Sequence, residues 1–237
     1  MLSQLPLVIR VDEQNSFANF VAGDNSALVD LLMRVSEGHR EPAVYIWGGA
    51  SGGKTHLLHA VFKRTQEHKR RVAYVPLATL SIDFPPSVLD QFEGLDIVCV
   101  DDVQSVAGID AWEAALFAFY NRIRDEGGTL VVAARFPPRQ LGLHLADLTS
   151  RLGNAVVWRL RPLNDEQKLI VLQQCAAQQG LLLDVDVGRY MLRHWVRDLP
   201  SLLRLFERLD YASLSRQRRL TVPFVREVME QDRAGWI

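Results

Sequence analysis

Residues 48–55 read Gly48-Gly49-Ala50-Ser51-Gly52-Gly53-Lys54-Thr55, which matches the pattern G-x-x-x-x-G-K-[ST]. An apolar, β-like segment precedes this loop at 43–47, and a helix-like segment follows it at 56–62. Strand, glycine loop and helix in this order form the context in which the pattern binds phosphate, whereas a bare glycine turn would match only by accident. The glycines let backbone N–H groups surround phosphate oxygens. We therefore expect residues 48–56, including His56, to bind ADP or ATP, with Lys54 on the β- and γ-phosphates and Thr55 on Mg²⁺.

The composition is that of a globular protein with an apolar core. The chain has 237 residues, of which 48% are apolar and 23% charged, and this length suffices for one large or two small domains. A net charge of −1 gives no global argument for nucleic-acid or membrane binding. We expect no membrane span and no secretory signal, hence a cytoplasmic protein in which Cys99 and Cys175 are buried thiols. The spacing of the histidines favours packing or surface roles for His56 and His59 over metal ligation.

Strand-like and helix-like segments alternate through the first two thirds of the chain. Besides 43–47, the strand-like segments are 72–75, 96–100, 129–134 and 155–158. A short helix is predicted at 87–92, and a long helix is predicted to begin at Asp110, with Glu113 completing a capping box. Five strands separated by helices predict an α/β fold with a five-stranded parallel sheet sandwiched by helices. Ligands of such sheets bind beyond the carboxyl ends of the strands.

The pattern changes near Pro162, after which only helix-like segments follow. Asn164 and Gln167 predict a capped helix that runs to Gly180, and further helices are expected at 187–196, at 200–215 and from Pro223. We therefore expect an N-terminal tail at 1–15, a nucleotide-binding α/β domain at 16–162 and an all-helical lid domain at 163–237.

Three side chains beyond the loop are candidates for phosphate chemistry. Asp101 ends a buried strand, which is where a carboxylate holds Mg²⁺ directly or through water. Asp102 could polarise an attacking water, although a residue that caps the next turn would look the same. Arg151 precedes the fifth strand, at the rim of the sheet, and could reach a γ-phosphate on a neighbouring subunit, which is worth roughly 10³–10⁵ in rate. The plain alternative is a surface arginine paired with Asp147.

Several segments resemble the bacterial replication initiator DnaA, an AAA+ ATPase. They are Phe17-Ala18-Asn19-Phe20-Val21 with Gly23 and Asn25, the loop with Lys54–Ala60, Val100–Gln104 with Ala107-Gly108, and Ser150–Gly153. The resemblance covers nearly the whole chain and implies an AAA+ fold with a helical lid. We expect neither a helix-turn-helix domain after the lid nor the N-terminal helicase-contacting domain. The chain is therefore more similar to the Hda family of short DnaA homologues, in the segments Pro137–Leu141, Leu145–Leu152 and Arg219–Val225.

The resemblance to Hda implies a negative regulator of replication initiation. Such a protein binds ADP, docks on the DNA-loaded sliding clamp (the β subunit of DNA polymerase III) and meets ATP-bound DnaA. Arg151 would then act on the ATP held by DnaA, and the resulting ADP-bound DnaA cannot restart replication. The segment Gln4-Leu5-Pro6-Leu7 resembles the clamp-binding peptide of that family, since a glutamine amide and two leucines on an extended terminus fit a hydrophobic pocket. A homodimer is compatible with this reading; membrane binding and sequence-specific DNA binding are not expected.

Two positions depart from the family pattern. The lid arginine that senses nucleotide would fall near Pro200, and the polar γ-phosphate sensor at the end of the fourth strand is replaced by Ala134-Arg135. We therefore expect weak or no autonomous ATP hydrolysis. The alternatives are a DnaA-like helicase loader, a stand-alone P-loop kinase or NTPase, and a nucleotide-stabilised scaffold. The clamp-like peptide favours the regulator over the loader, and the helical lid with an outward Arg151 favours it over a small-molecule enzyme.

Overall fold

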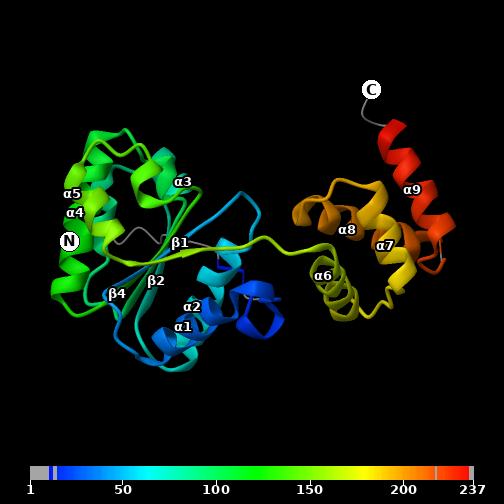
Figure 1. Cartoon of the computed structure of the whole chain (residues 1–237), viewed down its shortest axis with the longest axis horizontal. Coiled ribbons are helices and arrows are strands. Elements are labelled where there is room, and N and C mark those ends of the chain that lie inside the picture. The colour runs from blue at the N-terminus through cyan, green and yellow to red at the C-terminus, as the bar shows by residue number, and fades with distance from the viewer. Residues whose placement is uncertain (1–10, 13–14, 217, 235–237) are drawn as a thin grey trace, which may run out of the picture. The chain divides into compact units, whose positions relative to one another are not determined.

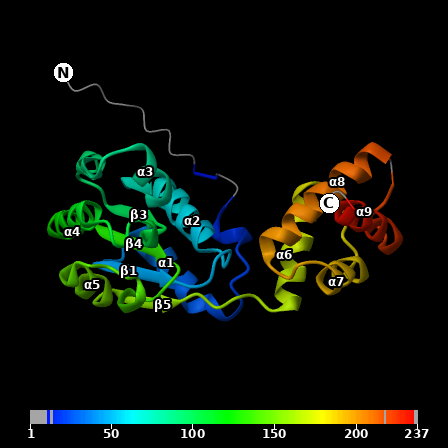
Figure 2. The same cartoon turned by 90° about the horizontal axis from the view of Figure 1, so that it is seen from above.

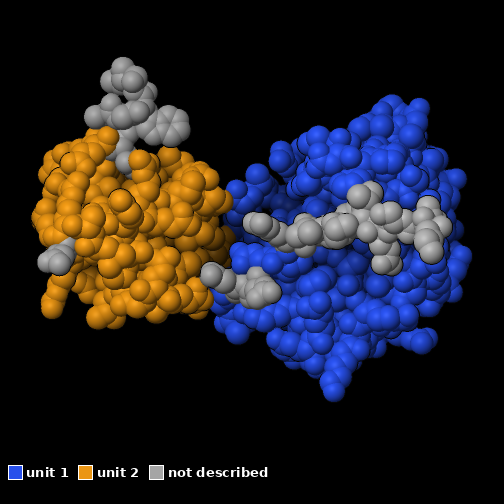
Figure 3. Space-filling view, turned by 180° about the vertical axis from the view of Figure 1, so that it is seen from behind, with its two compact units in different colours: residues 1–162 blue, residues 163–237 orange. Residues whose placement is uncertain are grey.

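The computed structural model describes residues 11–12, 15–216 and 218–234 of the chain. It divides the chain into two compact units, residues 1–162 and 163–237 (Figure 3). Unit 1 has two clusters of buried apolar side chains, and unit 2 has a cluster of its own. Within the described part of the chain, no helix has both the length and the apolar character that a membrane span needs.

Unit 1 is built on a parallel sheet of five strands in the order β2-β3-β4-β1-β5. The strands are β1 Ala43–Trp47, β2 Val72–Pro76, β3 Ile97–Asp101, β4 Thr129–Ala134 and β5 Val156–Arg159. Every residue of β3 and β4 is buried, which explains their continuous apolar runs, because helices cover both faces of the sheet. The predicted five-stranded parallel sheet is confirmed.

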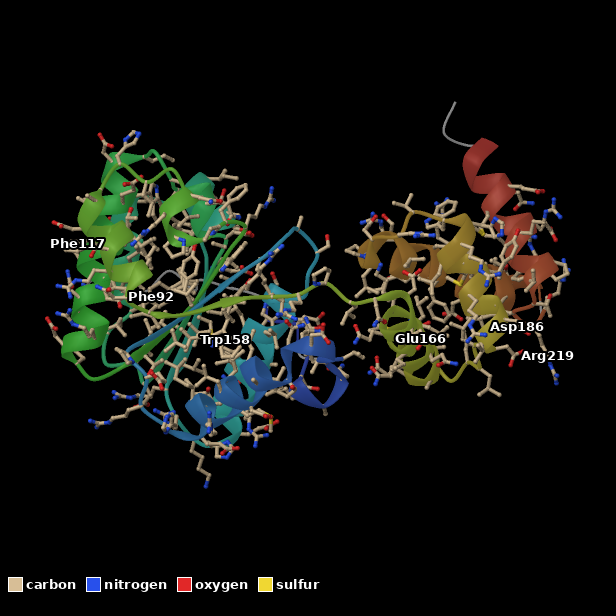
Figure 4. All side chains as sticks on the ribbon, viewed as in Figure 1. Phe92, Phe117, Trp158, Glu166, Asp186 and Arg219 are labelled. Carbon is tan, nitrogen blue, oxygen red and sulfur yellow. The ribbon has the colours of Figure 1, made fainter. Side chains whose placement is uncertain are left out.

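Neighbouring residues of the central strands enter different cores, one on each face of the sheet. Val44 and Ile46 pack with helices α1 (Ser26–Glu37) and α2 (Lys54–Glu67), whereas Tyr45 packs on the opposite face. That opposite face is covered by α3 (Leu77–Asp83), α4 (Asp110–Asp125) and α5 (Ala146–Gly153), as Figures 1 and 2 show. Among the side chains labelled in Figure 4, Phe92 and Phe117 belong to the α4 face and Trp158 to the α1 face.

Short 3₁₀ segments connect these elements at η1 Phe17–Asn19, η2 Gly23–Asn25, η3 Pro86–Gln91, η4 Val103–Ser105 and η5 Pro138–Gln140. The predicted helix at 87–92 is the 3₁₀ segment η3. The predicted capping box at Asp110 is wrong: α4 begins at Asp110 after Ile109, and no side chain caps it. The Glu113 carboxylate instead accepts hydrogen bonds from backbone N–H groups of two other loops.

Unit 2 contains four helices within the described residues: α6 Asp165–Gln178, α7 Val185–His194, α8 Leu199–Arg216 and α9 Val222–Ala234. The predicted cap at its start is confirmed, because the Asn164 side chain accepts from the Gln167 N–H and the Gln167 side chain accepts from the Asn164 N–H. Phe206 and Phe224 lie at the centre of its core. A Cβ on Gly188 would lie 2.2 Å from Leu169 Cδ1, so α6 and α7 approach closely at this glycine.

Candidate nucleotide site

The glycine loop begins where β1 lies between β4 and β5. The Gly48 N–H donates to the Ala134 carbonyl, and the Leu160 N–H donates to the Trp47 carbonyl over 2.7 Å. A Cβ on Gly48 would lie 2.9 Å from the Leu160 carbonyl oxygen, so the backbone spacing here requires glycine. Gly53 has a φ of +92°, and a Cβ there would lie 3.0 Å from the Phe20 ring. Two of the glycines in the motif are thus fixed by the protein's own packing.

Lys54 is buried and bonded to the carbonyls of its own loop. Its Nζ donates to the Gly48 carbonyl over 3.0 Å and to the Gly49 carbonyl over 2.7 Å. Burial lowers the pKa of the Lys54 ammonium, whereas the nearby carboxylates of Asp101 and Asp102 act to raise it. The ammonium group therefore lies under the loop, a position from which it can bind a phosphate that the loop surrounds.

Thr55 and Asp101, the two predicted metal ligands, are in direct contact. The Thr55 hydroxyl donates to Asp101 Oδ2 over 2.7 Å, and the carboxylate is only 2% exposed. The sequence separates these residues by 46 positions, and the sheet brings them together because β1 and β3 both flank β4. A hydroxyl and a carboxylate are the hard oxygen donors that Mg²⁺ takes from protein in phosphate sites, so this pair fits the ion. Among the residues that the structure describes, no three or more His, Cys, Asp or Glu form a cluster suited to a metal ion.

Asp102, the predicted base, follows in the left-handed conformation with φ 55° and ψ 47°. It occupies the N-cap position of η4, although its side chain caps nothing there. Its Oδ1 accepts from the Gln104 amide over 2.6 Å, and Gln104 Oε1 in turn accepts from the Arg135 N–H over 3.0 Å. Gln104 thereby connects the ends of β3 and β4, which sequence reasoning did not reveal.

Histidines on α2 tie the segment that precedes η1 to the nucleotide site. His56 Nε2 donates to the Ser16 carbonyl over 2.9 Å, and His59 Nδ1 accepts from the Asp12 N–H over 3.3 Å. His59 is 6% exposed, and its ring packs edge-on against Tyr74 with the centroids 4.6 Å apart. Burial lowers the pKa of both imidazoles, so both are predominantly neutral near pH 7. The expected packing role of these histidines agrees with their contacts.

Arg151 lies on α5, apart from the glycine loop in sequence and on the α4 face of the sheet. Its side chain is half-buried, and in the described residues its guanidinium has no hydrogen bond or ion pair, so the pairing with Asp147 does not form. Its carbonyl oxygen accepts a long hydrogen bond from the Tyr120 hydroxyl, at 3.5 Å. The arginine thus retains its donors for a partner.

Glu113 fixes the start of α5. The sequence pattern did not predict this role, because the spacing of Asp110 and Glu113 is also that of a capping box. Its carboxylate, in a residue only 1% exposed, accepts from the backbone N–H groups of Gly108, His144 and Leu145. Leu145 is the N-cap residue of α5, which begins at Ala146. Burial alone would raise the pKa of Glu113, but the three backbone donors outweigh it and hold the pKa below its ordinary value.

The two positions that depart from the family pattern lie at the end of β4 and at the start of α8. Ala134 is buried at the end of β4 and Arg135 is exposed directly after it. Pro200 lies in the first turn of α8, and the nearby Arg204 donates to Ser201 Oγ over 3.0 Å. The segment Gln4-Leu5-Pro6-Leu7 lies outside the described residues.

The sequence also matches known families. The model for the bacterial DnaA ATPase domain matches residues 11–159, more than half of the chain. The chain belongs to the bacterial DnaA ATPase family. A second family model, described as the lid domain of Hda, matches residues 165–229. This DnaA-type AAA+ ATPase therefore carries an Hda-type lid domain, and the resemblance inferred from the motifs is confirmed.

Solved structures show the same AAA+ fold. Domain III of the replication initiation protein DnaA from Thermotoga maritima has a TM-score of 0.85 and 21% identity, with 94% of this chain and 98% of that chain covered. AMPPCP-bound DnaA from Aquifex aeolicus has a TM-score of 0.76 and 17% identity, covering 94% and 71%. The Holliday junction branch migration motor RuvB of Thermotoga maritima has a TM-score of 0.72 and 17% identity, covering 91% and 71%. The predicted fold class, an AAA+ α/β domain with a helical lid domain, is confirmed.

Proposed function

We propose that this DnaA-family protein is a negative regulator of replication initiation that stimulates hydrolysis of the ATP bound to DnaA. In this proposal it holds ADP or ATP in its own glycine loop and docks on the DNA-loaded sliding clamp. It then presents Arg151 to the ATP of DnaA. The observation that carries the proposal is the match of residues 165–229 to the lid domain of Hda, beside a DnaA-type ATPase domain.

The contacts within unit 1 support nucleotide binding. Lys54 would exchange its bonds to loop carbonyls for bonds to the β- and γ-phosphates, and Thr55 with Asp101 would hold Mg²⁺. The ion, when bound, neutralises charge on the phosphate oxygens. A fold relative from Aquifex aeolicus was solved with AMPPCP bound. ADP, ATP and Mg²⁺ are therefore the proposed ligands.

The residues near the γ-phosphate side favour action in trans over autonomous hydrolysis. The Asp102 carboxylate is engaged by Gln104 at 2.6 Å, so its role as a base would require that bond to break. Arg135 stands where the family has a polar sensor, and Pro200 cannot contact phosphate. By contrast, the Arg151 guanidinium has no partner in the described residues, as a finger needs before it meets a neighbouring active site.

Docking on the clamp is assigned to Gln4, Leu5, Pro6 and Leu7. This part of the proposal depends on the sequence pattern, because these residues lie outside the described part of the chain. An extended peptide whose glutamine and leucines enter an apolar pocket is a recurring mode of recognition.

The test is a single-turnover measurement of labelled ATP bound beforehand to DnaA. We would add the DNA-loaded clamp, this protein, or both, and follow conversion to ADP. Fast conversion is expected only when both are present. Arg151→Ala should lower the stimulated rate by about 10³-fold or more, the range for removal of an arginine finger.

Arg34→Ala provides the matched control, because Arg34 is an exposed arginine on α1, which packs on the opposite face of the sheet from α5. This variant is expected to stimulate as the wild type does. Equal stimulation by wild type and Arg151→Ala would refute the finger and leave the scaffold reading. Absence of conversion under all conditions would reject the regulator, and the helicase loader would then be tested.

A further inference from the structure

Tyr74 is a third donor to the predicted metal carboxylate. Its hydroxyl donates to Asp101 Oδ2 over 3.0 Å, the same oxygen that accepts from Thr55 over 2.7 Å. Asp101 Oδ1 accepts from the Asp102 N–H over 2.9 Å. Asp101 therefore has donors on both oxygens before any ligand binds.

Strand register explains why Tyr74 reaches this carboxylate. Tyr74 pairs with Cys99 between β2 and β3, and Asp101 follows two residues later on the same face. Both Tyr74 and Cys99 belong to the core on the α2 side of the sheet, the side on which Thr55 also lies. A tyrosine side chain is long enough to span the remaining two residues of strand.

We propose that Tyr74 is a positioning residue for the magnesium site, which acts by holding Asp101 Oδ2 in place when the Thr55 oxygen binds the metal. This inference rests on the proposed binding of a magnesium nucleotide. Once Mg²⁺ binds, the Thr55 hydroxyl would have two tasks, because a lone pair would face the ion while its hydrogen points to Asp101. The Tyr74 hydroxyl has no such second task, so its bond persists in both states and limits the rotation of the carboxylate.

The Tyr74 ring is itself fixed. The His59 ring meets it at an interplanar angle of 79°, in the edge-to-face geometry that aromatic rings favour. His59 is in turn held by the Asp12 N–H and lies 3.2 Å from Asn15 Nδ2. A tyrosine that only filled space would not need its hydroxyl on a metal ligand.

The experiment compares Tyr74→Phe with Tyr45→Phe in the full chain. Tyr45 is a fully buried tyrosine whose hydroxyl donates to the Phe136 carbonyl over 2.8 Å, so its variant also loses one buried hydroxyl bond but none to Asp101. Binding of a fluorescent ADP analogue would be titrated in EDTA and then across Mg²⁺ concentrations. Melting temperatures without ligand would establish that each variant is folded.

Tyr74→Phe is expected to bind the nucleotide in EDTA as the wild type does. Its half-saturating Mg²⁺ concentration should rise about tenfold or more, the usual result of removing a bond to a metal ligand. Tyr45→Phe should leave both values unchanged.

Four results would overturn the inference. One is an unchanged Mg²⁺ dependence in a folded Tyr74→Phe, with the wild type binding normally; the proposed function would then stand. Another is an equal loss of affinity with and without Mg²⁺, which marks a general structural role, as would an equal Mg²⁺ shift in Tyr45→Phe. Failure of the wild type to bind the nucleotide at all would instead reject the proposed nucleotide site, and the inference with it.

Discussion

Replacing Glu113 with Gln alters one oxygen of a buried carboxylate that three backbone groups share. Glu113 Oε1 accepts from Gly108 over 2.7 Å and from His144 over 3.1 Å, and Oε2 accepts from Leu145 over 2.7 Å. A glutamine oxygen can retain the first two bonds. Its NH₂ group then faces the Leu145 N–H, so that one bond is lost and two donors meet.

The loss can be estimated from these contacts. A hydrogen bond to a charged group contributes about 1.5–3 kcal/mol, and a buried N–H left unpaired costs about 1–3 kcal/mol. Partial relaxation of the Leu145 N–H toward solvent reduces that second penalty, so we expect unit 1 to lose about 3 kcal/mol. For a domain of this size, that corresponds to a fall in melting temperature of roughly 6–12 °C.

The assay is urea unfolding followed by tryptophan fluorescence. Glu126→Gln is the matched control, since Glu126 also accepts a backbone N–H, from Gly94 over 3.0 Å, but is exposed. Its variant should lie within about 0.5 kcal/mol of the wild type. Because the pKa of Glu113 is lowered from 4.5 in the folded state, its contribution to stability is present above pH 4.5 and is lost as the pH falls through the lowered pKa. The gap between wild type and Glu113→Gln should therefore shrink toward pH 4. Equal stability of the two at pH 7 would refute the reasoning.

Two further predictions concern unit 1. Burial lowers the pKa of His59 from 6.5, even though Asp101 and Asp12 oppose the shift, so the unfolded state binds more protons than the folded state and stability should fall as the pH drops below about 6.5. The melting temperatures near pH 7.5 and 5.5 should therefore differ less in His59→Gln than in the wild type. An equal difference in the two proteins would contradict this. Gly48→Ala should lower the free energy of unfolding by about 1–3 kcal/mol, because its Cβ would meet the Leu160 carbonyl. Gly49→Ala has open space around its Cβ and should be nearly neutral in the same denaturation assay. Similar losses of stability in both variants would contradict the steric argument.

Local patterns in the sequence predicted the sheet and most of the helices. Buried parallel strands need continuous apolar runs, and the glycine loop needs a strand before it and a helix after it. The strands and the loop could therefore both be predicted from the sequence. The Asn164 cap could be predicted for the same reason, since Asn164 and its partner Gln167 are three residues apart. Asp110 and Glu113 show the same spacing, yet Glu113 serves a loop 31 and 32 residues away. Spacing alone cannot tell a local partner from a distant one.

The candidate site was only partly predictable for a related reason. Thr55 and Asp101 could be paired because β1, which leads into the glycine loop, and β3, which Asp101 ends, are parallel strands that end at one edge of the sheet. The contributions of Tyr74 and Gln104 depend on strand register and on the direction of individual side chains. No motif records either property, so these residues become visible only when the strands are placed side by side.

The contacts of Val11, Asp12 and Ser16 with the α2 side of the sheet matter for anyone who shortens this chain for expression. Val11 packs against the core on the α2 side, and the backbone of Asp12 and Ser16 bonds to His59 and His56. A clone that started at Phe17 would uncover apolar surface and remove these hydrogen bonds from both imidazoles. Trimming should therefore stop upstream of Val11, even if the tail before it is removed to separate the proposed clamp docking from the proposed nucleotide binding.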